Sequence, residues 1–215
     1  MPSERIVDRA WFSRHPVRVA YELIGTILHL ERDGVVVSGR IVEAEAYAGP
    51  NDLASHAARL KAGMTFLAAE PGTLYMYRSY GIHTMLNFIA HEPDHRGGIL
   101  IRALEPVAGI EIMRERRGPD ATSLASGPGV LTQAFGFRLD DSGHDVIGSA
   151  TIRLERDDVV MPVMAGPRIG ISKGLSAPYR FFAQGSPHVS SHRRGTPLAP
   201  HELDGIILPD DIIIV

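Results

Sequence analysis

The chain has 215 residues, of which 44% are hydrophobic and 22% charged, so it is long enough to bury a core and matches the average composition of soluble globular proteins. No apolar run approaches the length that spans a membrane, and the absence of cysteine excludes disulfides and thiolate metal sites. The formal net charge of −3 argues against a protein that holds nucleic acid mainly by bulk positive charge. The N-terminal residues carry charges and no apolar leader, so we expect a cytoplasmic protein.

The first half of the chain predicts one helix and several strands. A proline near its start and a glycine at its end frame a helix over residues 16–25. Strands expected over residues 26–31 and 35–47 flank the pair Asp33-Gly34, which is a hairpin signal. Two more strands are expected over residues 73–77 and 98–104.

The second half predicts two helices and two short strands. One helix is expected over residues 106–117, and Ser126 is expected to cap a second helix that ends at residue 135. Residues 168–171 and 179–182 are expected to form strands. Because strands and helices mix irregularly and not as repeated βαβ units, the pattern predicts an α+β fold with a curved, mostly antiparallel sheet and several short helices.

The strand expected over residues 35–47 carries an unusual face. Side chains alternate along a strand, so Ile41, Glu43, Glu45 and Tyr47 should share one side and small apolar residues the other. Two residues of strand separate the glutamates by about 7 Å, close enough for each to change the proton affinity of the other. One of them could then act as a base near neutral pH. The alternative is an ordinary solvated strand face.

Three of the six tyrosines gather at residues 75–80. Tyr75 and Tyr77 should share a face of a strand, while Tyr80 precedes Gly81 at a turn where an aromatic side chain would project outward. Aromatic rings stack on nucleobases, and the attraction grows when the base is cationic. The alternative is ordinary aromatic packing on a sheet.

These stretches, with others in order along the chain, resemble the alkyladenine DNA glycosylases, the mammalian-type 3-methyladenine DNA glycosylases that also occur in bacteria. The resemblance rests on IVEAEAYAGP at residues 41–50 with Asp52 and His56, PGTLYMY at 71–77 and YGIHTMLN at 80–87. It continues through LIRALEP at 100–106, SGP at 126–128, RIGI at 168–171 and RFFAQGSP at 180–187. It implies a single glycosylase domain over residues 1–190, followed by a C-terminal tail, residues 191–215, packed on it or partly extended.

The resemblance implies roles in the reaction for four residues of the motifs. Glu45 would be the general base that activates water and Glu43 its structural neighbour, while Arg102 and the backbone carbonyl of Ile169 would help to hold that water.

The base-binding roles follow in the same way. Tyr47 and Tyr77 would sandwich the flipped base, and His56 would add stacking and a hydrogen bond. Tyr80 would fill the vacated place in the base stack, and Asn87 would crowd the amino group of normal guanine.

The function implied is that of a monofunctional DNA glycosylase, which flips alkylated or deaminated purines out of duplex DNA and hydrolyses the N-glycosidic bond in base excision repair. The expected partner is double-stranded DNA that contains damaged purines. We expect no metal, no cofactor and no membrane, and a monomer in the cytoplasm associated with the nucleoid. Two alternatives stay open: a non-catalytic nucleic-acid-binding module on the same fold, and a carboxylate hydrolase of free nucleosides.

Overall fold

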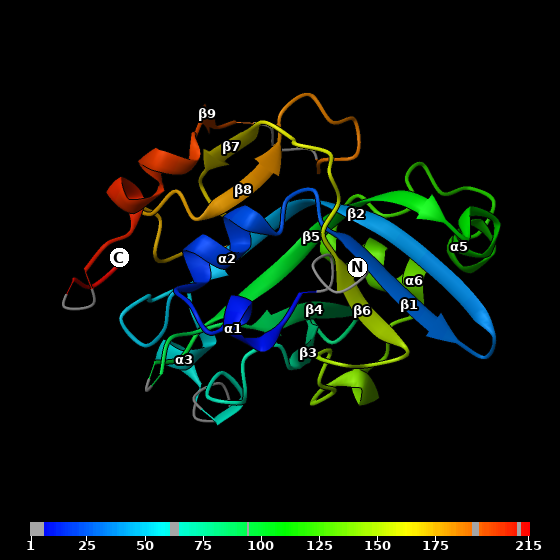
Figure 1. Ribbon diagram of the computed structural model, residues 1–215, viewed down its shortest axis with the longest axis horizontal. Coiled ribbons are helices and arrows are strands. Elements are labelled where there is room, and N and C mark those ends of the chain that lie inside the picture. Colours follow the sequence, from blue (N-terminus) through cyan, green and yellow to red (C-terminus); the bar gives the residue numbers. More distant parts are fainter. Residues whose placement is uncertain (1–6, 61–64, 94, 191–193, 210–211) are drawn as a thin grey trace.

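The structure is a computed structural model, which describes residues 7–60, 65–93, 95–190, 194–209 and 212–215 (Figure 1). Parts of the predicted tail, 191–193 and 210–211, and residues 61–64 after His56 therefore lie outside the described residues. The helices are α1 (Arg9–Phe12), α2 (Pro16–Glu22), α3 (His56–Arg59), α5 (Ile110–Arg117) and α6 (Pro128–Phe135), with 3-10 turns η1 (Leu139–Asp141) and η2 (Pro200–Ile206). The strands are β1 (Ile27–Arg32), β2 (Val35–Tyr47), β3 (Leu74–Ser79), β4 (His83–Ile89), β5 (Gly98–Ala108), β6 (Ile152–Glu155), β7 (Val163–Gly166), β8 (Arg180–Ala183) and β9 (Thr196–Pro197).

Within the described residues, the nine strands form a single sheet in the order β3-β4-β5-β2-β8-β7-β9, and β1 pairs with both β2 and β6. The pairs of named strands are antiparallel. The predicted α+β class with a mostly antiparallel sheet is confirmed.

The 13-residue strand β2 is the centre of this sheet. Its first half pairs with β1 across a turn in which Asp33 and Gly34 both have positive φ, as the predicted hairpin requires. Its second half lies between β5 and β8, so both of its edges there are paired. The glutamate-bearing part of the strand is therefore interior to the sheet and not at an edge.

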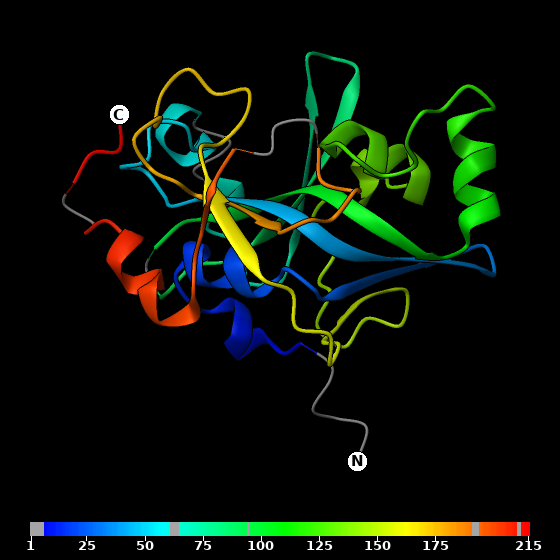
Figure 2. The same cartoon turned by 90° about the horizontal axis from the view of Figure 1, so that it is seen from above.

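Helices cover the two faces of the sheet unequally. Figure 2 shows α1 and α2 on one face, whereas α3, α6 and the β3–β4 hairpin rise on the other. Helix α2 packs on β2 and β5 and completes the main hydrophobic core, while α6 packs on β4 and β5. The core leaves part of the second face, between α3, α6 and the segment after β7, for a cavity.

A register shift beside Glu43 changes which residues share a face. The pairing of β2 with β5 passes from Ile41↔Leu104 to Glu43↔Ala103, so Val42 is an extra residue at this bulge. Ile41 consequently lies in the main core with Ala44, whereas Val42 packs in a separate cluster. The prediction that Ile41 shares the glutamate face is wrong, because strict alternation does not hold across a bulge.

Both predicted helices of the second half begin later than expected. Residues 106–108 continue β5, because Pro106 pairs with Gly39, and α5 begins only after Gly109, whose φ is 72°. Ser126 does not cap α6, which begins at Pro128; its hydroxyl donates instead to the carbonyl of His188 at 2.5 Å.

The strand predicted over residues 168–171 is also wrong. This segment is irregular: Gly170 has a φ of +75°, and the Ile169 amide donates to a carboxylate instead of a neighbouring strand. The strand predicted over residues 179–182 corresponds to β8.

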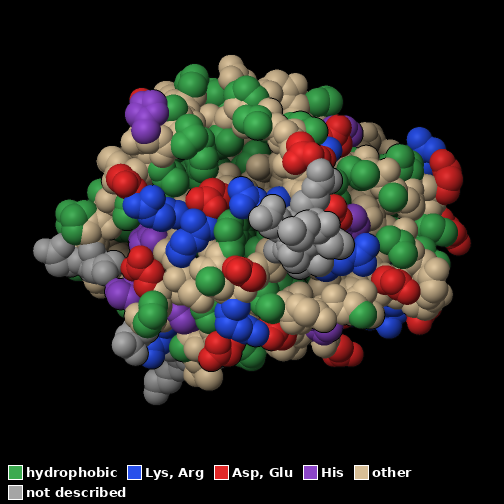
Figure 3. Space-filling view, viewed as in Figure 1, with side chains coloured by type: hydrophobic (Ala, Val, Ile, Leu, Met, Phe, Trp, Pro, Cys, Tyr) green, Lys and Arg blue, Asp and Glu red, His purple; other side chains and the backbone are tan. Residues whose placement is uncertain are grey.

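The face that carries α1 and α2 has side chains of both charge signs interspersed (Figure 3). No helix among the described residues is both long enough and apolar enough to cross a membrane.

Candidate active site

A cavity of about 610 Å³ opens on the face of the sheet that carries α3 and α6. Alternate residues of three neighbouring strands form its floor: Tyr75 and Tyr77 of β3, Met85 and Asn87 of β4, and Gly98, Leu100 and Arg102 of β5. Its walls come from Tyr47, His56 and the segment Ile169–Ser172. The volume is in the range of small-ligand sites.

The carboxylate of Glu45 lies directly beneath this cavity and is fully buried. It accepts hydrogen bonds from the amide of Ile169 at 2.8 Å and from the Tyr47 hydroxyl at 2.9 Å, and Arg102 approaches at 3.3 Å. Burial raises the pKa of Glu45, although the Arg102 charge and the two hydrogen bonds oppose this effect. The carboxylate can therefore accept a proton more readily than an exposed glutamate.

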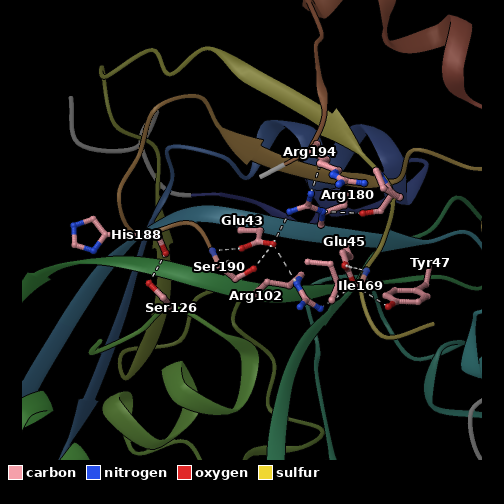
Figure 4. Close-up of polar contacts among 11 residues, drawn as sticks. Glu43, Glu45, Tyr47, Arg102, Ser126, Ile169, Arg180, His188, Ser190 and Arg194 are labelled. Atoms are coloured by element: carbon pink, nitrogen blue, oxygen red, sulfur yellow. Dashed lines mark hydrogen bonds and ion pairs between the residues drawn. The ribbon is translucent and has the colours of Figure 1, made fainter. Parts of the chain in front are cut away.

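Arg102 links the two glutamates of β2. Its Nε lies 3.3 Å from Glu43 and its terminal nitrogen 3.3 Å from Glu45 (Figure 4). Burial lowers the pKa of Arg102, but the charges of Glu45 and Glu43 outweigh burial and raise it overall. Arg102 thus stays cationic between the two carboxylates.

Glu43 is also fully buried and faces a second set of donors. Arg180 of β8 donates at 3.0 Å, and Ser190 donates through its amide at 2.8 Å and its hydroxyl at 2.9 Å. Because both glutamates are buried and bonded, the alternative of a solvated strand face is wrong.

Arg168 packs over the aromatic ring of Tyr47. The Arg168 guanidinium lies 4.9 Å from the centre of the Tyr47 ring, a cation–π distance. The same guanidinium makes a bidentate pair with the buried carboxylate of Asp52, at 2.5 and 2.8 Å. Burial, followed by the Glu45 charge, raises the pKa of Tyr47 well above its ordinary value, so its hydroxyl stays protonated and donates to Glu45.

Another part of the cavity lining is an aromatic group around His56. Its Nδ1 lies 3.0 Å from the Tyr75 hydroxyl, and its ring centre is 4.5 Å from that of Tyr77. Burial and then the Arg59 charge lower the pKa of His56, so it is neutral near pH 7. Burial is the main cause that raises the pKa of Tyr77 to about 12. This wall therefore presents neutral aromatic rings to the cavity.

Asn87 and Tyr80 occupy contrasting positions on the β3–β4 hairpin. The buried Asn87 side chain donates to the Tyr75 carbonyl at 3.0 Å, which fixes its amide at the cavity floor. Tyr80 is 89% exposed at the hairpin turn and has a φ of +50°. The hairpin rises well above the sheet in Figure 2.

Of the eight predicted site residues, seven line the cavity and the eighth, Glu45, contacts three of them. Ile169 contacts Glu45 through its amide, in addition to the water-holding role that the resemblance implies for its carbonyl. Among the described residues, no group of three or more His, Cys, Asp or Glu side chains is arranged to hold a metal ion.

Comparison with known protein families decides what kind of protein carries this cavity. Residues 10–187 match the family described as methylpurine-DNA glycosylase (MPG). The chain belongs to the methylpurine-DNA glycosylase family. It is therefore a DNA glycosylase, a hydrolase of base excision repair.

Bacterial relatives are similar over most of their length, and each bears the provisional name 3-methyladenine DNA glycosylase. The relative from Chlorobium phaeobacteroides is 41% identical over 192 residues, which cover 87% of this chain and 98% of its own. The relative from Koribacter versatilis is 42% identical, with 87% and 94% covered, and that from Nitrosospira multiformis is 44% identical, with 83% and 91% covered.

Sequence reasoning missed several residues that shape this glycosylase site. Arg168 and Arg180 stand in the matching motifs but received no role, and Ser190 lies beyond them. Buried arginines are rare unless they are paired, so an arginine within an apolar stretch such as PRIGI or YRFF was the available signal.

Proposed function

We propose that the cavity receives a damaged purine flipped out of double-stranded DNA, and that Glu45 activates the water that hydrolyses its N-glycosidic bond. The observation that carries the proposal is a buried carboxylate with a raised pKa beneath a cavity walled by neutral aromatic rings. A general base works best when its pKa approaches the working pH, and burial moves Glu45 in that direction.

The reaction needs one base and a good leaving group. Glu45 takes a proton from water as the oxygen bonds to C1′ of the sugar, and the bond from C1′ to the purine nitrogen breaks with its electron pair leaving on the base. Alkylation at N3 or N7 makes the purine cationic, so it departs as a neutral molecule. The Glu45 carboxylate also faces the positive charge that develops on the sugar.

Arg102 and the carbonyl of Ile169 are proposed to position the water. The contact between Arg102 and Glu45, 3.3 Å, is long for a charge-assisted hydrogen bond. Arg102 is therefore only weakly bonded to Glu45, and its side chain also lines the cavity that would hold the water. Among the described residues that line the cavity none is a lysine, so the proposal needs no amine and no Schiff base.

The base would lie between Tyr47 and Tyr77. Both rings are neutral and electron-rich, and such faces favour electron-poor, cationic purines. His56 would add a hydrogen bond, and the fixed amide of Asn87 would crowd the exocyclic amino group of guanine. Selectivity for damaged purines would then combine stacking with exclusion of the normal base.

Tyr80 would enter the base stack where the damaged nucleotide has left it. An exposed tyrosine at the tip of a projecting hairpin has the shape for this role. Neither a non-catalytic binding module nor a hydrolase of free nucleosides is favoured by the family, and the latter has no use for such a tip. We propose that the enzyme acts on nucleoid DNA as a monomer.

The test is single-turnover base release from duplexes that each contain one defined lesion. Glu45→Gln should lower the rate constant by about 10²- to 10⁴-fold, the usual contribution of a general base, while binding of the lesion duplex is retained. Glu111→Gln, the same change at an exposed position of α5, is the matched control and should release base at the wild-type rate. Release by Glu45→Gln at the parental rate would refute the assigned base.

A further inference from the structure

The last described residues of the chain reach the back of the active site. The Ile214 amide donates to the Asn51 carbonyl at 2.9 Å, and the Leu53 amide donates to the Ile214 carbonyl at 3.1 Å. Ile214 therefore holds both neighbours of Asp52 by a parallel bridge, and its side chain is 4% exposed.

Asp52, between these two contacts, is fully buried and makes no contact with the cavity surface. Its carboxylate accepts the amides of Ala48 and Ala54, each at 3.1 Å, and both terminal nitrogens of Arg168. The loop conformation that Ile214 holds thus helps to place the Arg168 guanidinium, which also donates to the carbonyls of Ala46 and Gly174.

The position of Arg168 affects two residues of the proposed reaction, Tyr47 and Glu45. Its guanidinium backs the Tyr47 ring, and the next residue, Ile169, donates its amide to Glu45 at 2.8 Å. The packing around this ion pair is tight, because a Cβ built on Gly174 would lie 2.6 Å from Arg168 and 2.9 Å from Asp52. A displacement of Asp52 would therefore pass directly to Tyr47 and to the Ile169 amide.

We propose that Ile214 is a positioning residue of the glycosylase reaction, which acts through Asp52 and Arg168 on the Tyr47 ring and on the Ile169 amide. The proposal rests on the proposed function, because it assigns Tyr47 and Glu45 their roles. Ile214 lies outside residues 10–187, the part that matches the family, so this support is carried by a segment beyond that match.

The first test compares Ile214→Asp with Ile213→Asp in the full chain. Both changes add the same charge to the same segment, but the Ile213 side chain is 58% exposed. Ile214→Asp should slow single-turnover release at saturating enzyme by about 10- to 100-fold, as small misplacements of catalytic groups do. Ile213→Asp should keep the wild-type rate constant. Ile214→Val, which keeps a β-branched apolar side chain, should retain most of the activity. Wild-type release by a folded Ile214→Asp protein would overturn the proposal.

The second test is a pH profile of release. Loss of the Ile169 and Tyr47 hydrogen bonds removes two influences that lower the pKa of Glu45, so Ile214→Asp should move the acid limb to higher pH. The charged or titratable groups that face Glu45 are Glu43 and Tyr47 on β2, Tyr77 on β3, Arg102 on β5 and Arg168 after β7. A mere loss of folded protein would scale the profile without moving it.

The third test is a double-mutant cycle with Asp52→Asn. If Ile214 acts through Asp52, the double variant should be about as slow as Asp52→Asn alone, because the two changes break one connection. Additive effects on the rate constant would overturn the proposed route.

Hydrogen exchange separates this proposal from the proposed function. The Ile169 amide should exchange faster in Ile214→Asp than in Ile213→Asp, whatever the activity. If the wild-type protein released no base from any lesion duplex, the proposed function would fail and this exchange comparison would still decide the role of Ile214. Equal protection in the two variants would refute it.

Discussion

Two glutamates separated by a single residue have different surroundings, and these separate their roles. Glu43 faces two arginines and both donors of Ser190, which is the environment of a structural ion pair. Glu45 is paired with one arginine, Arg102, and has a raised pKa. Environment, and not residue type, decides which of two neighbouring carboxylates acts as a base.

Glu43 is proposed to support the fold and not to contact the substrate, so Glu43→Ala should lower the free energy of unfolding. It leaves Arg180 and Arg102 without a shared buried carboxylate, a loss that costs about 3–5 kcal/mol in the free energy of unfolding. Urea denaturation measures this change. Glu22→Ala, which breaks the partly exposed pair with Arg14, should cost only about 0–1 kcal/mol. Equal costs for the two variants would contradict the structural role of Glu43.

The pH dependence of release should report Glu45. A base acts only when ionised, and the ionised fraction falls as the pH drops through its pKa, so the raised pKa of Glu45 moves the acid limb to higher pH than an exposed glutamate would give. Tyr47→Phe keeps the ring but removes a hydrogen bond that lowers this pKa, and it should move the limb further upward. Tyr21→Phe, which removes a hydroxyl bonded to the Leu198 carbonyl, is the control. An unmoved limb in Tyr47→Phe would exclude Glu45 as the titrating group.

At the scale of elements, local pattern predicted the long strand β2 and the face that carries Glu45 and Tyr47, because alternation and the Asp33-Gly34 turn are local signals. It failed where distant segments decide the structure. The bulge beside Glu43 depends on pairing with β5, and the irregular path of residues 168–171 depends on Asp52 and Glu45, more than 100 residues earlier. The partners of Arg168 and Arg180 are equally distant in sequence, so the apolar stretches around these arginines could indicate that they are buried and paired but not with which carboxylate.

The β3–β4 hairpin keeps a strained residue at its tip. A left-handed conformation is unfavourable for tyrosine by about 1–2 kcal/mol, and the exposed Tyr80 side chain makes little packing to offset it. Such strain is typical of functional positions.

Tyr80→Gly should therefore raise the free energy of unfolding by about 1 kcal/mol and slow base release. Tyr80→Ala should slow release without this gain, because alanine retains the strained backbone. Thermal unfolding and single-turnover release separate the two effects. Val160→Ala, at a side chain that is 92% exposed, serves as the control. Undiminished release by both Tyr80 variants would exclude an intercalating role.

At the scale of the whole molecule, an enzyme with a formal net charge of −3 must bind a polyanion. The face with α1 and α2 mixes both signs, so it offers no field that would attract DNA (Figure 3). Phosphate contacts should instead come from a few cations at the rim of the cavity. Arg59, exposed at the end of α3 and lining the cavity, is the candidate that the structure places best.

Arg59→Ala should weaken binding of lesion-containing and undamaged duplexes alike and reduce the slope of log affinity against log salt by about 1, as the loss of one phosphate contact does. Release at saturating enzyme should change less than binding, because the effect of Arg59 on the proposed base-binding residues is the lowering of the His56 pKa by its charge. Arg18→Ala is the matched control, since Arg18 pairs with Asp204 on the α2 side and should leave the slope unchanged. Fluorescence anisotropy over a salt series measures both. If the slope stayed the same in Arg59→Ala, this rim would not carry a phosphate contact, and the DNA backbone would have to be held by cations elsewhere around the cavity.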